Sequence, residues 1–187
     1  HTRDRRQRQM CIRDSFKPSA CETLRPYHLD ILAKCDQLAK NQESAYTDYR
    51  FNEIGQQLYD FLWSEFCDKF LEAVKGDLRD DASESQRETT LGVFDSVMLR
   101  YLQLLHPYMP HLTEELSLRM GYIKEGQFVM EKELPVSDLL DGVDVRKISE
   151  GCEQAAAVYK TAAQLRNLKA EYLSLIHISE PTRPLTI

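Results

Sequence analysis

Two histidines and two prolines interrupt an apolar stretch in the middle of the chain, LLHPYMPHLTEEL at positions 104–116. Imidazoles serve as metal ligands and general bases, so such a stretch could form a metal site or a catalytic loop. Two histidines that bind one metal ion from a helix stand four residues apart on the same face. His106 and His111 are five apart, and Pro107 and Pro110 break the backbone between them. The spacing therefore favours a rigid corner between two helices over a metal site.

The other reactive side chains give no catalytic pattern. Asp68 and Glu72 stand four residues apart, which without a cleft indicates ion pairs on a helix surface rather than general acid–base catalysis. The cysteines form no CxxC pair, so neither a zinc site nor a disulfide framework is indicated, and reduced cytosolic thiols are the default. No apolar run approaches the ~20 residues that cross a bilayer. We expect a cytoplasmic chain with no catalytic residue, metal, cofactor or membrane contact.

The two ends of the sequence are related at the DNA level. The stretches MCIRDS near the N-terminus and LSLIHI near the C-terminus can be encoded by one DNA element read in opposite orientations. Translated sequencing-library adapters have this property. We therefore expect residues 1–15 and 173–187 to be adapter-derived tails, and the segment between them to be a piece of a longer protein.

Charge limits the class of partner. The whole chain has 24 Lys+Arg and 30 Asp+Glu. Without the six arginines and three acidic residues of the expected tails, 18 Lys+Arg and 27 Asp+Glu remain, a formal charge of −9. An acidic body of this kind is no generic polyanion binder, and we expect no DNA partner. Contact with any nucleic acid requires a local basic patch.

The hydrophobic pattern predicts an all-α helical bundle. We expect helices at about 26–43, 47–75, 86–106 and 110–120, and another from about 144 onward. The second has apolar residues over much of its circumference, which indicates the spine of the bundle. Ser85 and Glu88 suggest a capping box at the start of the third. Periodicity is lost near 126–134, where we expect a short extended segment. The expected domains are a bundle at 16–143 and a truncated helix at 144–172.

The chain then resembles a known family. The stretches YRFNEIGQQLYDFLWSEFCDKFLEAVK and LRYLQLLHPYMPHLTEEL are similar to the anticodon-binding domain of the valyl-tRNA synthetases, a family of class I aminoacyl-tRNA synthetases. The family pattern is roughly RFN…LYxFxWxxFCDWYLE…K, followed by LLRLLHPxMPFxTEE. LRNLKAEY, at 165–172, resembles the segment IRNLRAEY of the same family. This chain departs from the pattern at Lys69, usually Trp, and at His111, usually Phe.

The resemblance implies a class I anticodon-binding bundle that receives the anticodon stem-loop of tRNA(Val). It implies that the full-length protein uses ATP and Mg to join valine to tRNA(Val) during translation. The class signatures HIGH and KMSKS do not occur between residues 16 and 172. The resemblance therefore implies a catalytically inactive piece without the catalytic and editing domains, and its own missing catalytic domain becomes an expected partner.

Sequence-specific RNA recognition favours unpaired loops, whose bases stack on aromatic or Arg planes and bond through their edges. Candidate contacts are therefore polar residues near helix ends: Arg50, Asn52, Lys69, Lys75, Arg100, His106, Arg166 and Lys169. Each has an alternative role. Asn52 suits a helix cap, Lys69 and Lys75 suit solvated charges near a helix C-terminus, and Arg100 suits a pair with a carboxylate. Trp63 fits the core better than a stacking platform.

Two other assignments stay open: the same module in a leucyl, isoleucyl or methionyl synthetase, and a helical protein-interaction bundle with no RNA role. In all three cases one core is expected to contain the apolar residues Phe61, Phe66, Phe70, Leu102 and Leu105.

Overall fold

The computed structural model of the chain describes residues 16–18, 21, 23–79, 81–131 and 138–179. The tail expected at 1–15 lies outside these residues. Of the tail expected at 173–187, only the backbone of 173–179 is described.

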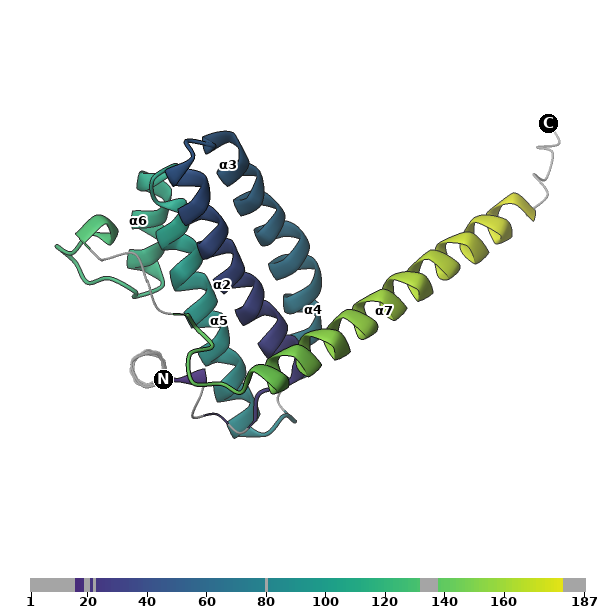
Figure 1. Cartoon of the computed structure of the whole chain (residues 1–187). Coiled ribbons are helices and arrows are strands. Elements are labelled where there is room, and N and C mark those ends of the chain that lie inside the picture. Colours follow the sequence, from purple (N-terminus) through teal and green to yellow (C-terminus); the bar gives the residue numbers. More distant parts are fainter. Residues whose placement is uncertain (1–15, 19–20, 22, 80, 132–137, 180–187) are drawn as a thin grey trace, which may run out of the picture.

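Every regular element of the described residues is helical, which confirms the all-α prediction (Figure 1). The elements are α2 (Pro26–Thr47), α3 (Phe51–Asp60), the π-helix η2 (Phe61–Phe70), α4 (Leu71–Val74), α5 (Glu84–Leu105), α6 (Pro110–Arg119), the 3-10 turn η3 (Val129–Glu131) and α7 (Val145–Ser179). The predicted helix at 47–75 is therefore α3, η2 and α4 in direct succession, without a break.

The expected extended segment at 126–134 is wrong for its described part. The backbone N–H of Phe128 donates to Glu131 Oε2 at 3.3 Å, and that of Val129 donates to Glu114 Oε1 at 2.8 Å. These two carboxylates satisfy the amides that a strand would pair with a neighbour, and the backbone closes into η3 instead. Residues 132–134 lie outside the described part of the chain.

The start of α5 also differs from the prediction. Its N-cap is Ser83, whose hydroxyl accepts the backbone N–H of Gln86 at 3.3 Å. Ser83 and Gln86 have the same S-x-x-Q/E spacing as Ser85 and Glu88, two residues earlier. Two overlapping signals competed, and the earlier one begins the helix.

The central element is α2 rather than the α3–η2–α4 helix that was expected to be the spine. It contacts α3, η2, α5 and α7. Its buried face includes Leu29, Leu32, Cys35 and Leu38. Figure 1 shows α2 between the α3–α4 rod and α5, with α6 on the far side of α5. A helix with neighbours on so many sides buries most of its turns.

The core joins α2, the α3–η2–α4 rod and α5. Phe61, Phe66 and Phe70 belong to it, as predicted, and Leu105 packs partly buried against it. Leu102 is buried, with 1% of its surface exposed, but is not part of this cluster. All five predicted core residues are therefore buried or partly buried, and four of them belong to this cluster or pack against it.

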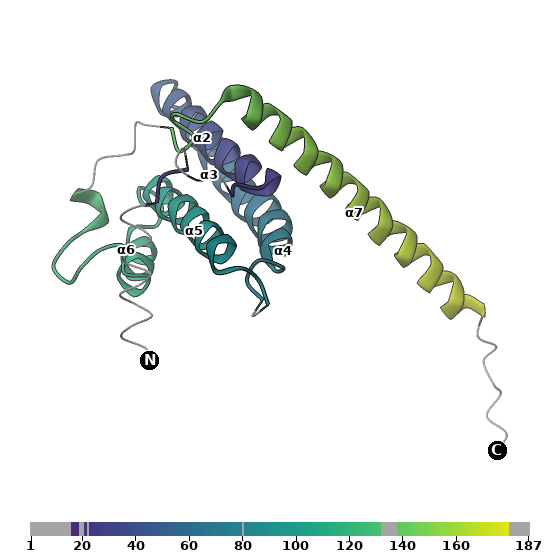
Figure 2. The ribbon, with the colours of Figure 1, turned by 90° about the horizontal axis from the view of Figure 1, so that it is seen from below.

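The helix α7 lies on the bundle only at its beginning. Gly151 allows a close crossing, since a Cβ there would lie 2.6 Å from Leu29 Cδ1 of α2. Ala155 is buried, and the ammonium groups of Lys34 and Lys69 lie 5.8 and 6.0 Å from the ring centroid of Tyr159. Figure 2 shows that the remainder of α7 extends away from the bundle. The seam with the bundle therefore uses the first half of the helix.

Candidate nucleic-acid interface

The loop between α5 and α6 is a corner held by side-chain hydrogen bonds. His106 Nδ1 lies 2.7 Å from Thr113 Oγ1, and the Thr113 hydroxyl lies 3.0 Å from the carbonyl oxygens of Met109 and Pro110. The hydroxyl hydrogen points to a carbonyl, so Nδ1–H of His106 donates to Oγ1. His106 Nε2 is also 3.9 Å from Glu114 Oε1. The predicted rigid corner is confirmed, and His106 stabilises it from a largely buried position.

This corner lies beside the turn between α2 and α3. The hydroxyl of Tyr108 donates to the carbonyl oxygen of Phe51 at 3.3 Å. Tyr49, in the turn, has a φ of 57° and leaves 79% of its surface exposed. Phe51 and Met109 are also about half exposed. We call the surface formed by Tyr49, Arg50, Phe51, Asn52, Tyr108 and Met109 the corner face.

Two of the predicted contacts lie on the corner face. Arg50 precedes α3 and is partly exposed, with Nη1 2.5 Å from Glu53 Oε2 and Nη2 3.1 Å from Asp48 Oδ2. Exposed ion pairs of this kind contribute little to stability, so the guanidinium can exchange partners. Asn52 is exposed in the first turn of α3, and no side-chain bond caps that helix.

Four other candidates lie along the α4 and α7 side of the molecule. Lys69 bonds to Glu65 at 2.7 Å and faces Tyr159, so it takes part in the α7 seam. Lys75 bonds to Glu72 at 2.5 Å. This bond lowers the pKa of Glu72, and the charge of Arg166 lowers it further. Arg166 and Lys169 are exposed on α7. The predicted contacts on this side are all cationic.

Arg100 is placed in the interior. Its guanidinium Nη1 donates to Asp36 Oδ1 at 2.6 Å, and only 5% of its side chain is exposed. The same carboxylate accepts the backbone N–H groups of Leu139 and Leu140, at 2.8 and 3.2 Å. The structure therefore confirms the alternative role of Arg100, an ion pair with a carboxylate. Asp36 thereby joins α2, α5 and the segment that leads to α7.

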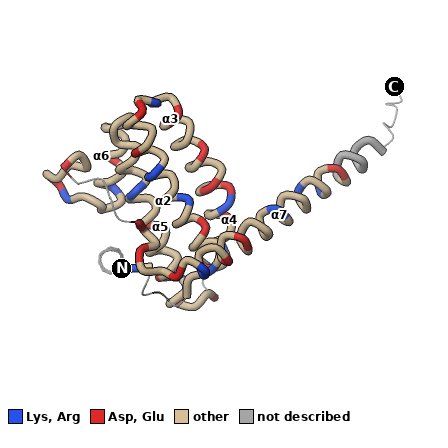
Figure 3. Tube along the Cα trace, viewed as in Figure 1, with Lys and Arg blue, Asp and Glu red and all other residues tan. Residues whose placement is uncertain are grey.

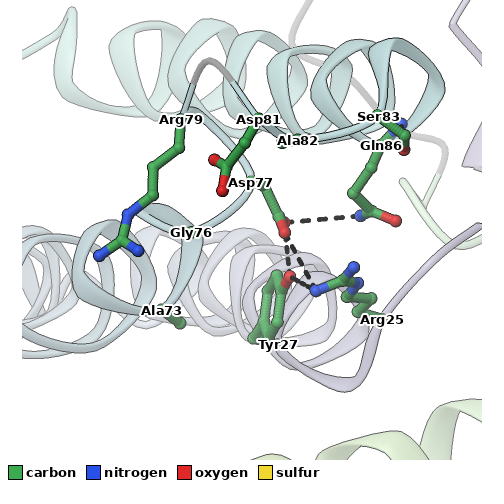
Figure 4. Close-up of a pocket in the computed structure, with 10 residues that line it drawn as sticks. All are labelled: Arg25, Tyr27, Ala73, Gly76, Asp77, Arg79, Asp81, Ala82, Ser83 and Gln86. Atoms are coloured by element: carbon green, nitrogen blue, oxygen red, sulfur yellow. Dashed lines mark hydrogen bonds and ion pairs between the residues drawn. The ribbon is translucent and has the colours of Figure 1, made fainter.

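Sequence patterns did not reveal a second polar centre, around Asp77 at the opposite end of the bundle. Its Oδ2 accepts hydroxyl hydrogens from Tyr27 at 2.5 Å and Thr90 at 2.9 Å, and Oδ1 lies 3.1 Å from Arg25 Nη1. Figure 4 shows Arg25, Tyr27 and Asp77 beside a pocket of about 310 Å³. Helices α2 and α5 and the turn after α4 meet only in three dimensions, so no spacing rule signals this network.

Beside this network, His28 is fully buried and neutral. Its Nδ1 accepts the backbone N–H of Arg25 at 3.2 Å, so the ring hydrogen must be on Nε2. Nε2 lies 3.0 Å from Thr90 Oγ1, which passes a hydrogen bond on to Asp77. Burial lowers the pKa of His28 to about 4, although the Asp77 carboxylate opposes the shift. The arrangement is a satisfied structural network, with no free acid or base.

The expectation that Trp63 belongs to the core is wrong. Its side chain is 52% exposed, beside Tyr59, which is 60% exposed, with ring centroids 6.2 Å apart. Trp63 follows the buried Phe61 by two residues, which places it on about the opposite side of the helix, at the outer face.

The described residues contain neither a metal-binding cluster nor a membrane-spanning helix. No group of three or more His, Cys, Asp or Glu side chains is placed to hold a metal ion among them. Within the same residues, no helix combines the length and apolar character that a membrane span requires.

Comparison with known proteins gives a consistent result. A family model described as the anticodon-binding domain of tRNA ligase matches residues 28–174. A valine–tRNA ligase of Geobacter sulfurreducens is 32% identical over 166 residues, which is 84% of this chain and 18% of that protein. One of Dehalococcoides mccartyi is 33% identical over 144 residues, 76% of this chain and 16% of the relative. One of Xanthomonas campestris is 43% identical over 89 residues, 46% of this chain and 9% of the relative. The chain spans less than a fifth of the length of these relatives.

Proposed function

The chain belongs to the family of anticodon-binding domains of tRNA ligases, and we propose that it is the part of a valine–tRNA ligase that binds the anticodon stem-loop of tRNA(Val). The longer enzyme joins valine to tRNA(Val) with ATP and Mg, in the cytoplasm where tRNA is charged for translation. The catalytic and editing work belongs to parts outside this chain. What this bundle contributes is affinity and a choice among anticodons.

The corner face carries the proposal. Unpaired bases need flat surfaces for stacking and polar groups for their edges. Tyr49 and Phe51 expose aromatic rings, and Arg50 and Asn52 stand on either side of Phe51 with donors and acceptors at the surface. The hydrogen bond from Tyr108 to Phe51 holds the turn against the α5–α6 corner. A stacking surface that is fixed before binding loses less entropy when a base docks on it.

The α4 and α7 side suits phosphates instead. Lys75, Arg166 and Lys169 are exposed cations. Phosphate contacts orient a stem but carry no sequence information. We therefore assign affinity to this group and anticodon choice to Arg50 and Asn52. Arg100 is not assigned a contact, since its charge is buried against Asp36. His106 acts through the corner that it stabilises, and Lys69 through the α7 seam.

The test is a titration of the chain with an RNA hairpin that copies the valine anticodon arm, and with the same hairpin carrying a swapped anticodon, at one stated salt concentration. We expect preference for the valine anticodon and a loss of that preference in Asn52→Ala and Arg50→Gln. Arg119→Gln is the matched control, because Arg119 is an exposed arginine paired with Glu115 on α6. Equal binding of both hairpins by the folded chain would contradict the proposal.

A further inference from the structure

The outer face of α3 and η2 presents an aromatic pair that no part of the proposed RNA site uses. Tyr59 and Trp63 are both more than half exposed and lie side by side. Large aromatic side chains at a surface are typical of binding interfaces, where a few of them can carry much of the binding energy. Trp63 is the single tryptophan of the chain. We call Tyr59, Asp60, Trp63 and Asp68 the aromatic–acidic face.

The charge around this pair is negative. Between positions 51 and 68 the sequence contains no Lys or Arg, and it contains the carboxylates Glu53, Asp60, Glu65 and Asp68. Figure 3 shows acidic positions recurring along this rod. Glu53 is paired with Arg50, and Glu65 with Lys34 and Lys69. Asp60 and Asp68 form no ion pair with any described residue, so their charges remain for a partner.

The helical geometry brings these carboxylates to the two aromatic rings. Asp60 directly follows Tyr59 and precedes Trp63 by three residues, and Gln56 Nε2 donates to its Oδ1 at 2.8 Å. Asp68 follows Trp63 by five residues, which is the hydrogen-bond step of a π-helix and therefore about one turn. Asp60 and Asp68 thus flank Trp63 on an exposed surface.

This combination disfavours RNA and favours a cationic polypeptide. Phosphates beside Asp60 and Asp68 are repelled, and a base that stacks on Trp63 brings its phosphate with it. A guanidinium gains from both features: it lies over an indole ring through cation–π attraction, and it pairs with a carboxylate. We propose that the aromatic–acidic face is a docking surface for a polypeptide segment that carries arginine beside a large apolar side chain.

The single tryptophan makes the test direct, because all tryptophan emission reports on Trp63. The chain is titrated with a short helical peptide of leucine and arginine, and with the same peptide carrying citrulline, a neutral analogue, in place of arginine. We expect a saturable change of emission with the arginine peptide and none with the citrulline peptide. Asp60→Asn with Asp68→Asn is expected to weaken binding about fivefold, since two exposed charge pairs together contribute about 1 kcal/mol.

Two further variants test whether a loss of binding reflects unfolding or a general loss of surface charge. Tyr59→Ala alters an exposed side chain, so the fold is retained by circular dichroism, and binding is expected to weaken. Glu125→Gln with Asp141→Asn removes two exposed charges outside the face and is expected to leave binding unchanged. Equal binding by this control pair and by Asp60→Asn with Asp68→Asn, or no saturable response, overturns the proposal.

A last titration, with the anticodon hairpin in place of the peptide, tests whether RNA binds to the same face. If the hairpin changes Trp63 emission and Tyr59→Ala weakens that binding, the face is a base-stacking platform and the docking proposal is wrong. That outcome leaves anticodon binding by the chain intact. If the hairpin does not bind at all but the arginine peptide gives a specific response, anticodon binding by the chain is contradicted and the docking proposal stands.

Discussion

Acidification from pH 7 to pH 4 is expected to destabilise this bundle, with His28 as a main contributor beside the carboxylates. The imidazole is fully buried, and its pKa falls from 6.5 to about 4 because burial disfavours the charged ring. The Asp77 carboxylate, 3.9 Å away, raises the pKa only in part. Protonation would also place a hydrogen on Nδ1, which already accepts the N–H of Arg25. The charged ring therefore loses the bond that caps α2.

The sign and the size of the effect follow from the two pKa values. The folded state has the lower pKa, so below pH 6.5 the unfolded chain binds the proton more readily. The contribution of His28 to stability is complete above about pH 6.5 and is lost progressively down to about pH 4. Each pKa unit corresponds to about 1.4 kcal/mol, so the loss is about 3 kcal/mol. This is a large share of the 5–15 kcal/mol that is typical of a domain.

The assay is urea unfolding followed by circular dichroism at several pH values between 7 and 4. His28→Gln is the control, because a glutamine can accept from Arg25 and donate to Thr90 but does not titrate. Subtracting its pH profile removes the contribution of the carboxylates. We expect the difference to grow to about 3 kcal/mol toward pH 4. An imidazole of His28 that titrates near 6.5 in the folded chain, observed by NMR, would refute the reasoning.

Three further changes probe other parts of the structure. Asp36→Ala leaves the charge of Arg100 buried and is expected to cost about 3–5 kcal/mol in urea unfolding, whereas a near-neutral effect would show that the pair is dispensable. Phe66→Ala opens the core and is expected to cost about 3–5 kcal/mol, while Trp63→Ala at the surface is expected to cost less than 1; equal losses would contradict the burial described above. Ser83→Ala removes the cap of α5 and is expected to lower stability by about 1 kcal/mol, unless Ser85 is the true cap and Ser83→Ala is silent.

The existence and the approximate limits of the helices could be predicted from the sequence because they depend on local signals. Pro26 and Pro110 mark helix starts, Gly121 has the positive φ of 75° that ends α6, and apolar residues recur at helical steps. The corner at His106 followed from Pro107, which a helix interior does not accommodate, and from Pro110, which suits the first turn of a new helix. Limits were less certain where two signals overlapped, as at Ser83 and Ser85.

The polar interior could not be predicted, because its members are distant in the chain. Asp36 and Arg100 are separated by 64 residues, and Tyr27 and Asp77 by 50. A buried carboxylate has no sequence pattern of its own, since the groups that satisfy it come from whichever elements happen to pack around it. The burial of Arg100 against Asp36 could not be predicted for the same reason, and because it is buried we assign it no contact with RNA.

The position of Trp63 shows how a helix period decides what a surface can bind. The core prediction treated Trp63 as part of an apolar stripe that covers much of the circumference of the helix predicted at 47–75. In the structure Phe61 and Phe66 are both buried, five residues apart, because η2 has i to i+5 hydrogen bonds that align such pairs. With these two rings on the inner side, Trp63 must point outward. A five-residue step between large aromatic residues was the available signal, and a helix that buries both of them leaves its tryptophan on the exposed face.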